Sequence, residues 1–456
     1  MLEREIIHPV SNYSVVLYHA VSRYVKSISN FASAAADFFY FWRFSVDHRA
    51  VILLYAELLF AFAIVWKEGL FRTIPQRIAV VSLVSLAFVL RYCVLPYETL
   101  DYQDWLAVWL NSFRTEGAWT ALGHEIWSCN YNVPYLYFLA LISKTDVTEL
   151  LLIKDLSIFF DVLLAWFTLK LVSLFCSSSA RRLTAFIGTL WLPTVFLNGS
   201  LWGQCDVIYA AFAVLAVYLM LSDHPAWSVA AIAVSISFKL QGIFLLPVYF
   251  VYLISGKMKI WHIAIFPATY ILTILPAVFA GRSFLELLLL YYNNTGSIGD
   301  GLNYNASSLY ALFDFSNMNA GTAANVGIVL AFIFCIGIFA WAVVRRSRLN
   351  NRSLLILSIL FCVGVPFLLP HMHDRYFFMA DALTFALAVI EPRLSPAAVL
   401  VTCGSLLGYH AYLKMRYLIP MRWGSIFMLV ALVIVFAYAV FQIHGKKQLT
   451  SAENLI

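Results

Sequence analysis

The sequence predicts an all-α polytopic membrane protein, built as a bundle of about 13 transmembrane helices (12–14). Of its 456 residues, 62% are hydrophobic and only 12% are charged, and the mean hydropathy is +0.83. Soluble domains are about half apolar and about a quarter charged. The apolar residues gather in runs of about 20, the length that crosses a bilayer as a helix. The basic residues behind the net charge of +6 flank these runs, which indicates membrane topology rather than a nucleic-acid-binding surface.

Thirteen apolar runs are predicted to be membrane helices: 50–66, 78–96, 151–176, 183–200, 206–222, 226–239, 242–255, 261–279, 326–344, 353–369, 376–391, 396–413 and 423–443. Residues 1–49 are predicted to form interfacial helices, with a fourteenth span as the alternative. Residues 50–443 then form a single transmembrane domain, and 444–456 a cytoplasmic tail. Residues 1–10 lack a cleavable signal pattern, so the first membrane helix is expected to act as the insertion signal.

The loop charges predict the orientation. Basic clusters in alternate connections place those connections in the cytoplasm. The long external loops 97–150 and 280–325 then lie together on the opposite face, and the first of them is predicted to carry amphipathic helices. The basic residues Lys414, Arg416 and Arg422 are an exception, because this topology places them outside. Contact with anionic lipid or a lipid phosphate and a topology error near the C-terminus explain them equally well.

Cysteine is scattered along the chain. Five of the seven cysteines lie in or beside apolar runs, which predicts small core residues rather than a disulfide framework or a metal site. Cys129 and Cys205 fall in predicted loops on the same face, so a bond between them is an alternative.

The first external loop carries the candidate catalytic acids. Asp101 and Asp104 follow the second predicted span and precede an amphipathic segment over 105–113. Such a segment lies flat at the interface and shapes a cavity above the spans. A carboxylate at the rim of that cavity accepts the proton of an acceptor hydroxyl. The alternative is that these acids only solvate a helix end.

The residues after this loop suit sugar recognition. Tyr131 and Tyr135 offer ring faces to pyranose C–H groups and hydroxyls to polar partners, although interfacial anchoring explains them almost as well. Asp161 lies two turns inside the next predicted span, where it needs a partner or a watery cavity. A structural ion pair and a substrate role are about equally supported.

Two breaks between apolar runs carry further polar side chains. The turn over 198–206 presents Trp202, Gln204 and Asp206 to the same cavity as Asp101, and its glycines permit close backbone approach. The break at 237–242 presents Lys239, whose ammonium suits a phosphate. A lysine that snorkels at a helix end is the alternative.

The stretch 369–378 concentrates charge at a membrane boundary. Arg375 can fork onto phosphate oxygens, and His371 or His373 can add a hydrogen bond or a titratable proton. The His-x-His spacing also permits a metal, but no cysteine or dense acidic cage accompanies it. We therefore predict no metal and no other cofactor.

These motifs, in this order, resemble those of bacterial integral-membrane glycosyltransferases related to the GPI-mannosyltransferase-like branch of the C-type superfamily (GT-C). The resemblance covers residues 78 to 391. It is carried by Asp101-Tyr102, Pro134 to Tyr137, Lys154 with Asp161, LWGQCD (201–206), FKLQ (238–241) and LPHMHDRYFF (369–378). The chain departs from the family pattern in an N-terminal extension of about 75 residues and in Asp374, where glutamate is often found.

The resemblance implies an inverting transferase that takes a sugar from a polyprenyl-phosphate donor on the extracytoplasmic face.

 In this superfamily an essential acid lies in the first external loop, which maps to Asp101, with Asp104 as the second candidate. The donor phosphate and sugar are then expected to contact Lys239, Gln241, His371, His373, Arg375 and Tyr376. The acceptor or its sugar is expected to contact Tyr131, Tyr135, Asp161, Trp202, Gln204 and Asp206.

The expected partners are a polyprenyl-phosphate-linked sugar donor, a glycan, lipid or protein acceptor, and membrane lipids, with no nucleic acid. The resemblance also implies a bacterial plasma membrane with the active site on the extracytoplasmic face. A flippase or transporter of lipid-linked glycans is the alternative from another class. Such a protein needs charge along a path across the whole membrane, whereas the candidate residues here cluster at one face, which favours the enzyme.

Overall fold

The structure is a computed structural model that describes residues 48–294 and 301–444. The predictions for residues 1–47, including the interfacial helices, and for the tail from 445 onward lie outside the described residues. From Arg49 the chain packs as one compact unit. The division into an N-terminal extension, a transmembrane domain and a tail therefore stays a prediction.

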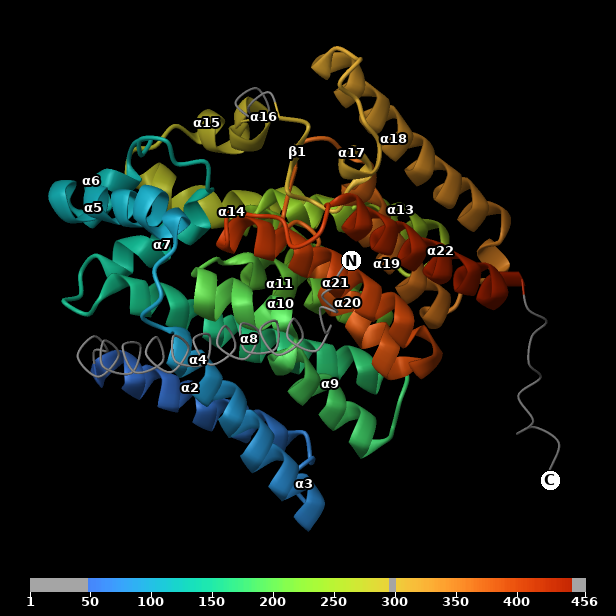
Figure 1. The fold of residues 1–456 in the computed structure, drawn as a ribbon, viewed down its shortest axis with the longest axis horizontal. Helices are drawn as coiled ribbons and strands as arrows, with labels where there is room; N and C mark the ends of the chain where they lie inside the picture. The colour runs from blue at the N-terminus through green and yellow to red at the C-terminus, as the bar shows by residue number, and fades with distance from the viewer. Residues whose placement is uncertain (1–47, 295–300, 445–456) are drawn as a thin grey trace, which may run out of the picture. The chain divides into compact units, whose positions relative to one another are not determined.

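The predicted all-α class is confirmed (Figure 1). The only regular strands among the described residues are two short ones, β1 (Asn303–Tyr304) and β2 (Met372–His373). The α-helices are α2 (His48–Lys67), α3 (Ile74–Ala79), α4 (Ser85–Val94), α5 (Ala107–Glu116), α6 (Ala118–Leu122), α7 (Val133–Ile142), α8 (Glu149–Ser173), α9 (Ser179–Trp191), α10 (Pro193–Phe196), α11 (Asp206–Leu221), α12 (Pro225–Phe238), α13 (Pro247–Ile254), α14 (Ile265–Phe279), α15 (Phe284–Leu288), α16 (Leu290–Asn294), α17 (Leu309–Leu312), α18 (Ala320–Val344), α19 (Asn351–Leu368), α20 (Phe378–Ile390), α21 (Ser395–Leu413) and α22 (Arg422–His444).

Each of the thirteen predicted spans corresponds to a helix or a broken helix, but the count of 13 is not confirmed. Seven described helices are long and apolar enough to cross a membrane, or up to eight if the bent pair Ser179–Trp191 and Pro193–Trp202 is one span. Several others, such as α11, α12 and α20, are apolar but shorter. These helices identify an integral membrane protein.

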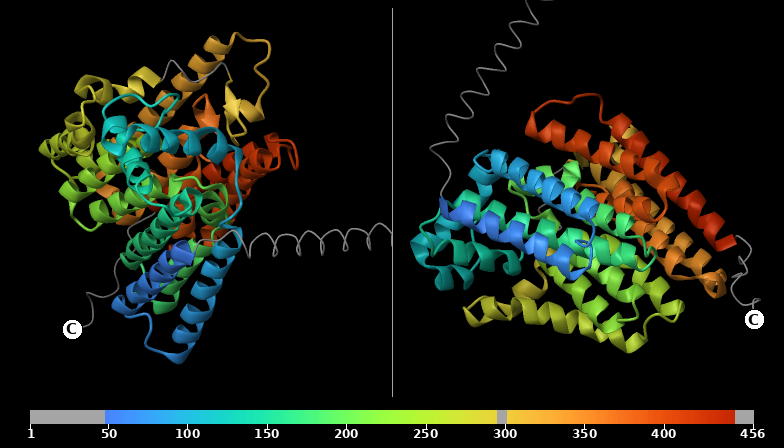
Figure 2. Two further views of the ribbon diagram at one scale, coloured as in Figure 1. Left: turned by 90° about the vertical axis from the view of Figure 1, so that its left-hand side faces the viewer. Right: turned by 90° about the horizontal axis from the view of Figure 1, so that it is seen from below.

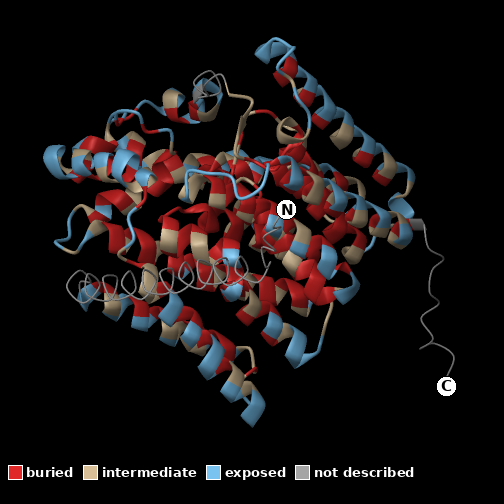
Figure 3. Cartoon of the chain, viewed as in Figure 1, coloured by how far each residue is buried: buried red, intermediate tan, exposed pale blue. Residues whose placement is uncertain are grey.

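Helices at the centre of the unit are buried, and those at its edge expose apolar side chains. α8 packs against α9 and α11, and α20 packs against α21, in the interior of the bundle (Figure 2). Burial follows the same division, since α11, α19 and α20 are almost wholly buried whereas α2 and α18 are largely exposed (Figure 3). Exposed leucine, isoleucine and phenylalanine on the outer helices are expected of a surface that faces lipid.

The segment that leads to Asp101 is fixed by a buried lysine. The ammonium of Lys154, in α8, donates to the carbonyl oxygens of Val94, Leu95 and Tyr97 at 3.1, 2.9 and 2.6 Å. These carbonyls lie at the end of α4, where a helix leaves its last acceptors without partners. The backbone just before Asp101 is thereby held against α8.

Irregular helical turns flank the same region. A π-helical turn over Tyr102–Leu106 follows Asp101, and another over Leu197–Trp202 precedes Gly203. Gly203 has φ of 79°, a left-handed conformation that favours glycine, and the amide of Gln204 donates back to the Asn198 carbonyl at 2.9 Å. This turn ends the helix and separates it from α11. Such π-helical turns are frequent at functional sites.

The two short strands join distant parts of the chain. β1 and β2 pair in parallel, with Asn303 opposite Met372 and Tyr304 opposite His373. The backbone amide of His371 also donates to the Leu302 carbonyl at 2.8 Å. The second external loop is therefore attached to the stretch between α19 and α20.

Candidate active site

A cavity of about 660 Å³ opens between the two loops predicted to be external and the ends of the buried helices. It takes its walls from distant segments, namely the turn at Asp101, α5, the loop before α7, the turn before α11, β1, the β2 region and the end of α21. Its lining residues are Asp101, Trp105, Leu106, Trp109, Glu125, Ser128, Cys129, Asn130, Tyr131, Gln204, Tyr304, Asn305, His373, Asp374, Arg375 and Tyr412. Polar and aromatic side chains dominate this lining.

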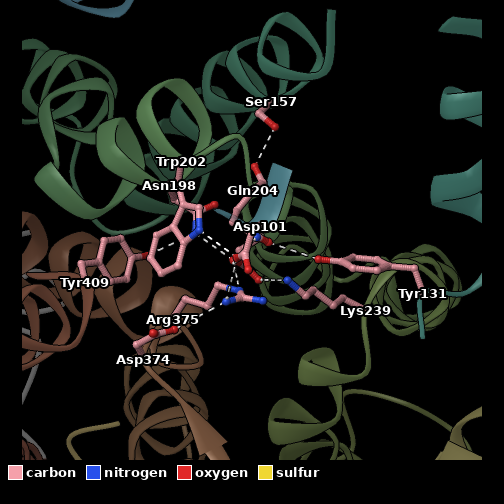
Figure 4. A network of polar contacts seen from close by, with 11 residues as sticks. Asp101, Tyr131, Ser157, Asn198, Trp202, Gln204, Lys239, Asp374, Arg375 and Tyr409 are labelled. Carbon is pink, nitrogen blue, oxygen red and sulfur yellow. Dashed lines mark hydrogen bonds and ion pairs between the residues drawn. The ribbon is translucent and has the colours of Figure 1, made fainter. Parts of the chain in front are cut away.

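Asp101 is held by two donors from the turn before α11. Its Oδ2 accepts hydrogen bonds from Trp202 Nε1 at 2.8 Å and from Gln204 Nε2 at 2.6 Å (Figure 4). Both donors converge on one oxygen, and an ionised carboxylate has acceptor sites on its second oxygen as well. Thr99 fixes the turn itself, because its hydroxyl donates to the Trp202 carbonyl at 2.9 Å. The carboxylate is therefore oriented before any substrate binds.

Arg375 lies among three carboxylates (Figure 4). Its Nη1 is 3.7 Å from Asp101 Oδ2 and 3.5 Å from Asp374 Oδ1, and its Nε is 3.4 Å from Asp206 Oδ2. These are long contacts, and within the described chain Arg375 Nε has no hydrogen-bond partner. Because a buried donor without an acceptor is costly, this arrangement leaves hydrogen-bonding capacity for a ligand.

Lys239 and Asp206 form a second ion pair beneath the cavity. The Lys239 ammonium bonds to Asp206 Oδ1, and Asn198 Nδ2 donates to Asp206 Oδ2 at 2.8 Å. Asp206 is fully buried, and Lys239 is 8% exposed. Asp206 thus links the two cations that were predicted to bind phosphate.

Aromatic rings support these charges. The Trp202 ring stacks on Tyr412 with centroids 4.4 Å apart, and the Arg375 guanidinium lies 5.4 Å from the Trp202 ring centroid. On the other wall, Lys239 Nζ lies 5.2 Å from the ring centroid of Tyr131, whose hydroxyl donates to Gln204 Oε1 at 3.2 Å. Ring faces beside hydrogen-bonding groups provide the surfaces on which sugars pack.

The two histidines of the 369–378 stretch have different surroundings. His373 lines the cavity, and its ring stacks on Tyr304 at 4.6 Å between centroids. Burial, together with Arg375 and Lys239, lowers the pKa of His373 to about 3, so this ring is neutral near pH 7. His371 has a φ of 60°, and its Nδ1 bonds to the Gly301 carbonyl at 2.7 Å. His371 therefore attaches the second external loop and does not line the cavity.

Asp374 is the buried carboxyl next to Arg375. It is 3% exposed, and its Oδ1 has no hydrogen-bond partner within the described chain. Burial raises the pKa of Asp374 to about 7, and the nearby Arg375 opposes this rise. The charge on this wall of the cavity consequently changes near neutral pH.

Other predicted residues do not reach the cavity. Asp104 is exposed and does not line the cavity. Asp161 is fully buried and pairs with Arg91 Nη2 at 2.9 Å, which favours the structural ion pair that the sequence left open. Tyr135 packs its ring 5.1 Å from Tyr131, behind the wall. Gln241 is buried beside Tyr376, also outside the lining.

The sequence did not single out several lining residues. Tyr304 and Asn305 lie in the second external loop, which has no distinctive pattern, and Tyr412 ends an otherwise ordinary apolar run. Trp109 was predicted only as part of the amphipathic segment, although its burial against Tyr131 fits the spacing of that segment. Glu125 carried no signal beyond its charge.

The described residues form neither a disulfide bond nor a metal-binding cluster. Cys129 and Cys205 are both free thiols. Across residues 48–294 and 301–444, no group of three or more His, Cys, Asp or Glu side chains has a metal-binding arrangement. The absence of a metal requirement stays a prediction.

A comparison of the sequence with protein-family models identifies a family that matches this chain. Residues 136–370, just over half of the chain, match the family model described as "Glycosyltransferase family 87". The match contains Trp202, Gln204, Asp206 and Lys239, and it ends immediately before His371. No curated protein matches the sequence.

Proposed function

Because the chain belongs to glycosyltransferase family 87, we propose that it moves a sugar from a polyprenyl-phosphate donor to an extracytoplasmic glycan or lipid-linked acceptor, with inversion at the anomeric carbon. The family makes the chain a membrane glycosyltransferase, in agreement with the predicted GT-C type. The donor, the stereochemistry, the base and the face of the membrane are parts of the proposal.

The observation that carries the proposal is the approach of Arg375 to Asp101, with 3.7 Å between Nη1 and Oδ2 at the cavity. An inverting displacement needs a base beside the acceptor hydroxyl and a cation beside the leaving phosphate. The two groups lie on the same cavity, which is large enough to hold sugar units between its aromatic walls. Asp104, the second candidate base, has no comparable position.

The reaction follows from these positions. Asp101 accepts the proton of the acceptor hydroxyl while the hydroxyl oxygen forms a bond to the anomeric carbon of the donor sugar. The bond from this carbon to the phosphate oxygen breaks, and its electron pair leaves with the polyprenyl phosphate. Arg375, assisted by Lys239, stabilises the charge that develops on the leaving phosphate. One displacement of this kind inverts the anomeric carbon.

Phosphate binding also requires the ion pairs to rearrange. Arg375 and Lys239 both contact carboxylates, so a phosphate must compete with Asp206 and Asp374 for them. A proton on Asp374 removes one competing charge. The Arg375 Nη1 nitrogen, which lies 3.5 Å from Asp374 Oδ1, is then available to contact a phosphate oxygen.

The test is a transfer assay with the purified full-length chain in lipid nanodiscs. Labelled polyprenyl-phosphate sugars are offered with a panel of glycan and lipid-linked acceptors, and the anomeric configuration of the product is determined. We expect a new glycosidic bond of inverted configuration that requires Asp101. A product of retained configuration would exclude this mechanism.

The same preparation separates the enzyme from a flippase. Asp101→Asn and the matched control Asp104→Asn remove the same charge three positions apart, one at the cavity and one on an exposed surface. The proposal predicts loss of transfer for the first variant alone. Movement of an intact lipid-linked glycan across the membrane, with no bond formed, would contradict the proposal.

A further inference from the structure

The loop between α21 and α22, together with the first two residues of α22, forms a basic surface without acidic partners among the described residues. We refer to these residues, 414–423, as the rim loop. Lys414, Arg416 and Arg422 are all exposed. None of the three forms an ion pair with a carboxylate anywhere in the described residues. The sequence also has no Asp or Glu from Ser395 to Ile443. The rim loop therefore carries three positive charges that the described protein does not neutralise.

The rim loop is also apolar. Its Met415, Tyr417, Leu418 and Trp423 side chains are 73%, 58%, 66% and 48% exposed. Large exposed apolar side chains next to basic ones are typical of segments that lie in the headgroup region of a bilayer. Exposure of this kind is unfavourable in water, which indicates a lipid environment for the loop.

The position of the rim loop agrees with this environment. The loop joins two helices that are long and apolar enough to span a membrane, Pro392–Leu413 and Arg422–Ile443, so it lies where both reach the membrane surface. It belongs to the cavity side, because Tyr412 lines the cavity and the Tyr417 hydroxyl donates to Asn305 Oδ1 at 2.8 Å. α21 and α22 lie side by side (Figure 1).

Several basic residues at the opposite ends of the helices have acidic partners, although others there, such as Arg72, Lys259 and Arg346, form no ion pair with the described residues. Arg352 lies 3.3 Å from Glu391, Lys257 lies 2.7 Å from Asp223, and Arg182 lies 3.1 Å from Glu68, each between side-chain nitrogen and oxygen. The rim loop lacks such pairs and lies on the side where the positive-inside rule disfavours lysine and arginine. Anionic headgroups at the membrane surface can compensate its charge.

We propose that the rim loop binds the anionic headgroups of phospholipids in the leaflet on the cavity side. The three basic side chains contact headgroup phosphates, and Met415, Leu418 and Trp423 insert between the acyl chains. The bond from Tyr417 to Asn305 connects this lipid contact to the wall of the cavity. The proposal does not depend on the sugar-transfer function, since lipid binding is measured without donor or acceptor.

Lipid retention tests the proposal directly. The purified full-length chain is reconstituted in nanodiscs with equal amounts of phosphatidylglycerol and phosphatidylcholine, and the lipids that remain bound after mild extraction are counted by native mass spectrometry. We expect the wild-type chain to retain phosphatidylglycerol preferentially. The variant K414S/R416S/R422S is expected to lose this preference by roughly tenfold or more, because each surface cation contributes to anionic-lipid binding.

The matched control removes the same charge at the other end of the helices. The variant R72S/K259S/R346S replaces three exposed basic residues there and is expected to retain phosphatidylglycerol as the wild type does. Equal losses in both triple variants would contradict the proposal. Exchange of bound phosphatidylglycerol for polyprenyl phosphate at equal concentrations would also contradict it, because the site would then belong to the sugar carrier.

A second measurement does not depend on the triple variants. Trp423 fluorescence in the wild-type chain is quenched by lipids brominated on the acyl chain when they lie nearby, once the other tryptophans are corrected for with the Trp423→Phe variant. Quenching by brominated phosphatidylglycerol that exceeds quenching by brominated phosphatidylcholine, and that falls at high salt, supports the proposal. Equal quenching by the two lipids at low salt would overturn it.

Discussion

Arg375 Nη1 lies 3.7 Å from Asp101 Oδ2, although 274 positions of sequence separate the two residues. The contact brings the predicted base within reach of the cation predicted to bind the leaving phosphate. Neither residue is free, because Asp101 accepts two hydrogen bonds and Arg375 also faces Asp206 and Asp374. The site is thus a network in which each substitution changes the partners of several groups.

Replacement of Asp101 by Asn is expected to lower kcat by about 10²–10⁴, the usual contribution of a general base. The amide keeps the shape of the side chain but does not accept the acceptor proton. Initial rates of sugar transfer at saturating donor measure the effect. Asp104→Asn should transfer at close to the wild-type rate, and an equal loss in both variants would show that charge on the loop, rather than a base, is responsible.

Replacement of Trp202 by Phe tests the orientation of Asp101. The variant keeps a ring to stack on Tyr412 but removes the Nε1 donor to the carboxylate. Hydrogen bonds to charged groups contribute about 1.5–3 kcal/mol, so kcat is expected to fall by about 10–100-fold. Trp109→Phe is the control, because Trp109 Nε1 has no hydrogen-bond partner in the described chain. A similar loss in the control would assign the effect to packing.

Replacement of Arg375 by Lys keeps the positive charge but removes the planar guanidinium and its several N–H donors. A single ammonium cannot face Asp101, Asp206 and Asp374 as the guanidinium does, and it offers phosphate a point charge. We expect the donor KM to rise by about tenfold or more and kcat to fall as well, because the leaving phosphate loses its contacts in the transition state. Steady-state kinetics with varied donor would show this, and wild-type parameters would remove Arg375 from the phosphate site.

The pKa of Asp374, about 7, predicts a pH dependence of donor binding. Below this pH the carboxyl is mostly protonated and neutral, and above it the carboxylate competes with the phosphate for Arg375. The donor KM is therefore expected to rise by about tenfold between about pH 6 and about pH 8. Asp374→Asn, which is neutral throughout, should keep a low KM across this range. A KM that rises equally in the variant would assign the dependence to another group.

The Arg91–Asp161 pair makes a prediction about stability. Both side chains are buried, and Arg91 also donates to the Leu190 carbonyl at 3.0 Å. Arg91→Met leaves a buried acid without its partner, and it is expected to lower the free energy of unfolding by about 3–5 kcal/mol. Thermal unfolding in detergent measures the loss, and R91M/D161L should recover part of it. A fall in kcat of the folded R91M protein would instead indicate a substrate role for Asp161.

The sequence was sufficient to predict the bundle and the polar centre of the site. Long apolar runs form helices largely independently of tertiary packing, so each predicted span corresponds to a helix or a broken helix in the structure. Asp101, Gln204 and Arg375 were predictable because a charged or polar side chain at a membrane boundary needs a partner or a ligand.

The remaining walls depend on tertiary contacts that leave no local pattern. Tyr304 reaches the cavity because its two-residue strand pairs with the strand at Met372–His373. Strands this short have no sequence periodicity from which they could be predicted. Tyr412 lies in the cavity because it stacks on Trp202, which only the packing of α21 determines. The same limit explains Asp104, which has the same residue type as Asp101 but does not line the cavity.

The attachment of β1 to β2 has a consequence for biogenesis. The cavity takes residues from Asp101 to Tyr412, and its second wall closes only when Tyr304 pairs with His373. A nascent chain whose early helices have already entered the membrane therefore has the acid but neither the guanidinium nor the closing wall. We therefore expect sugar transfer to begin only after almost the entire chain has been synthesised and inserted, so that partly made protein would not consume the proposed lipid-linked donor.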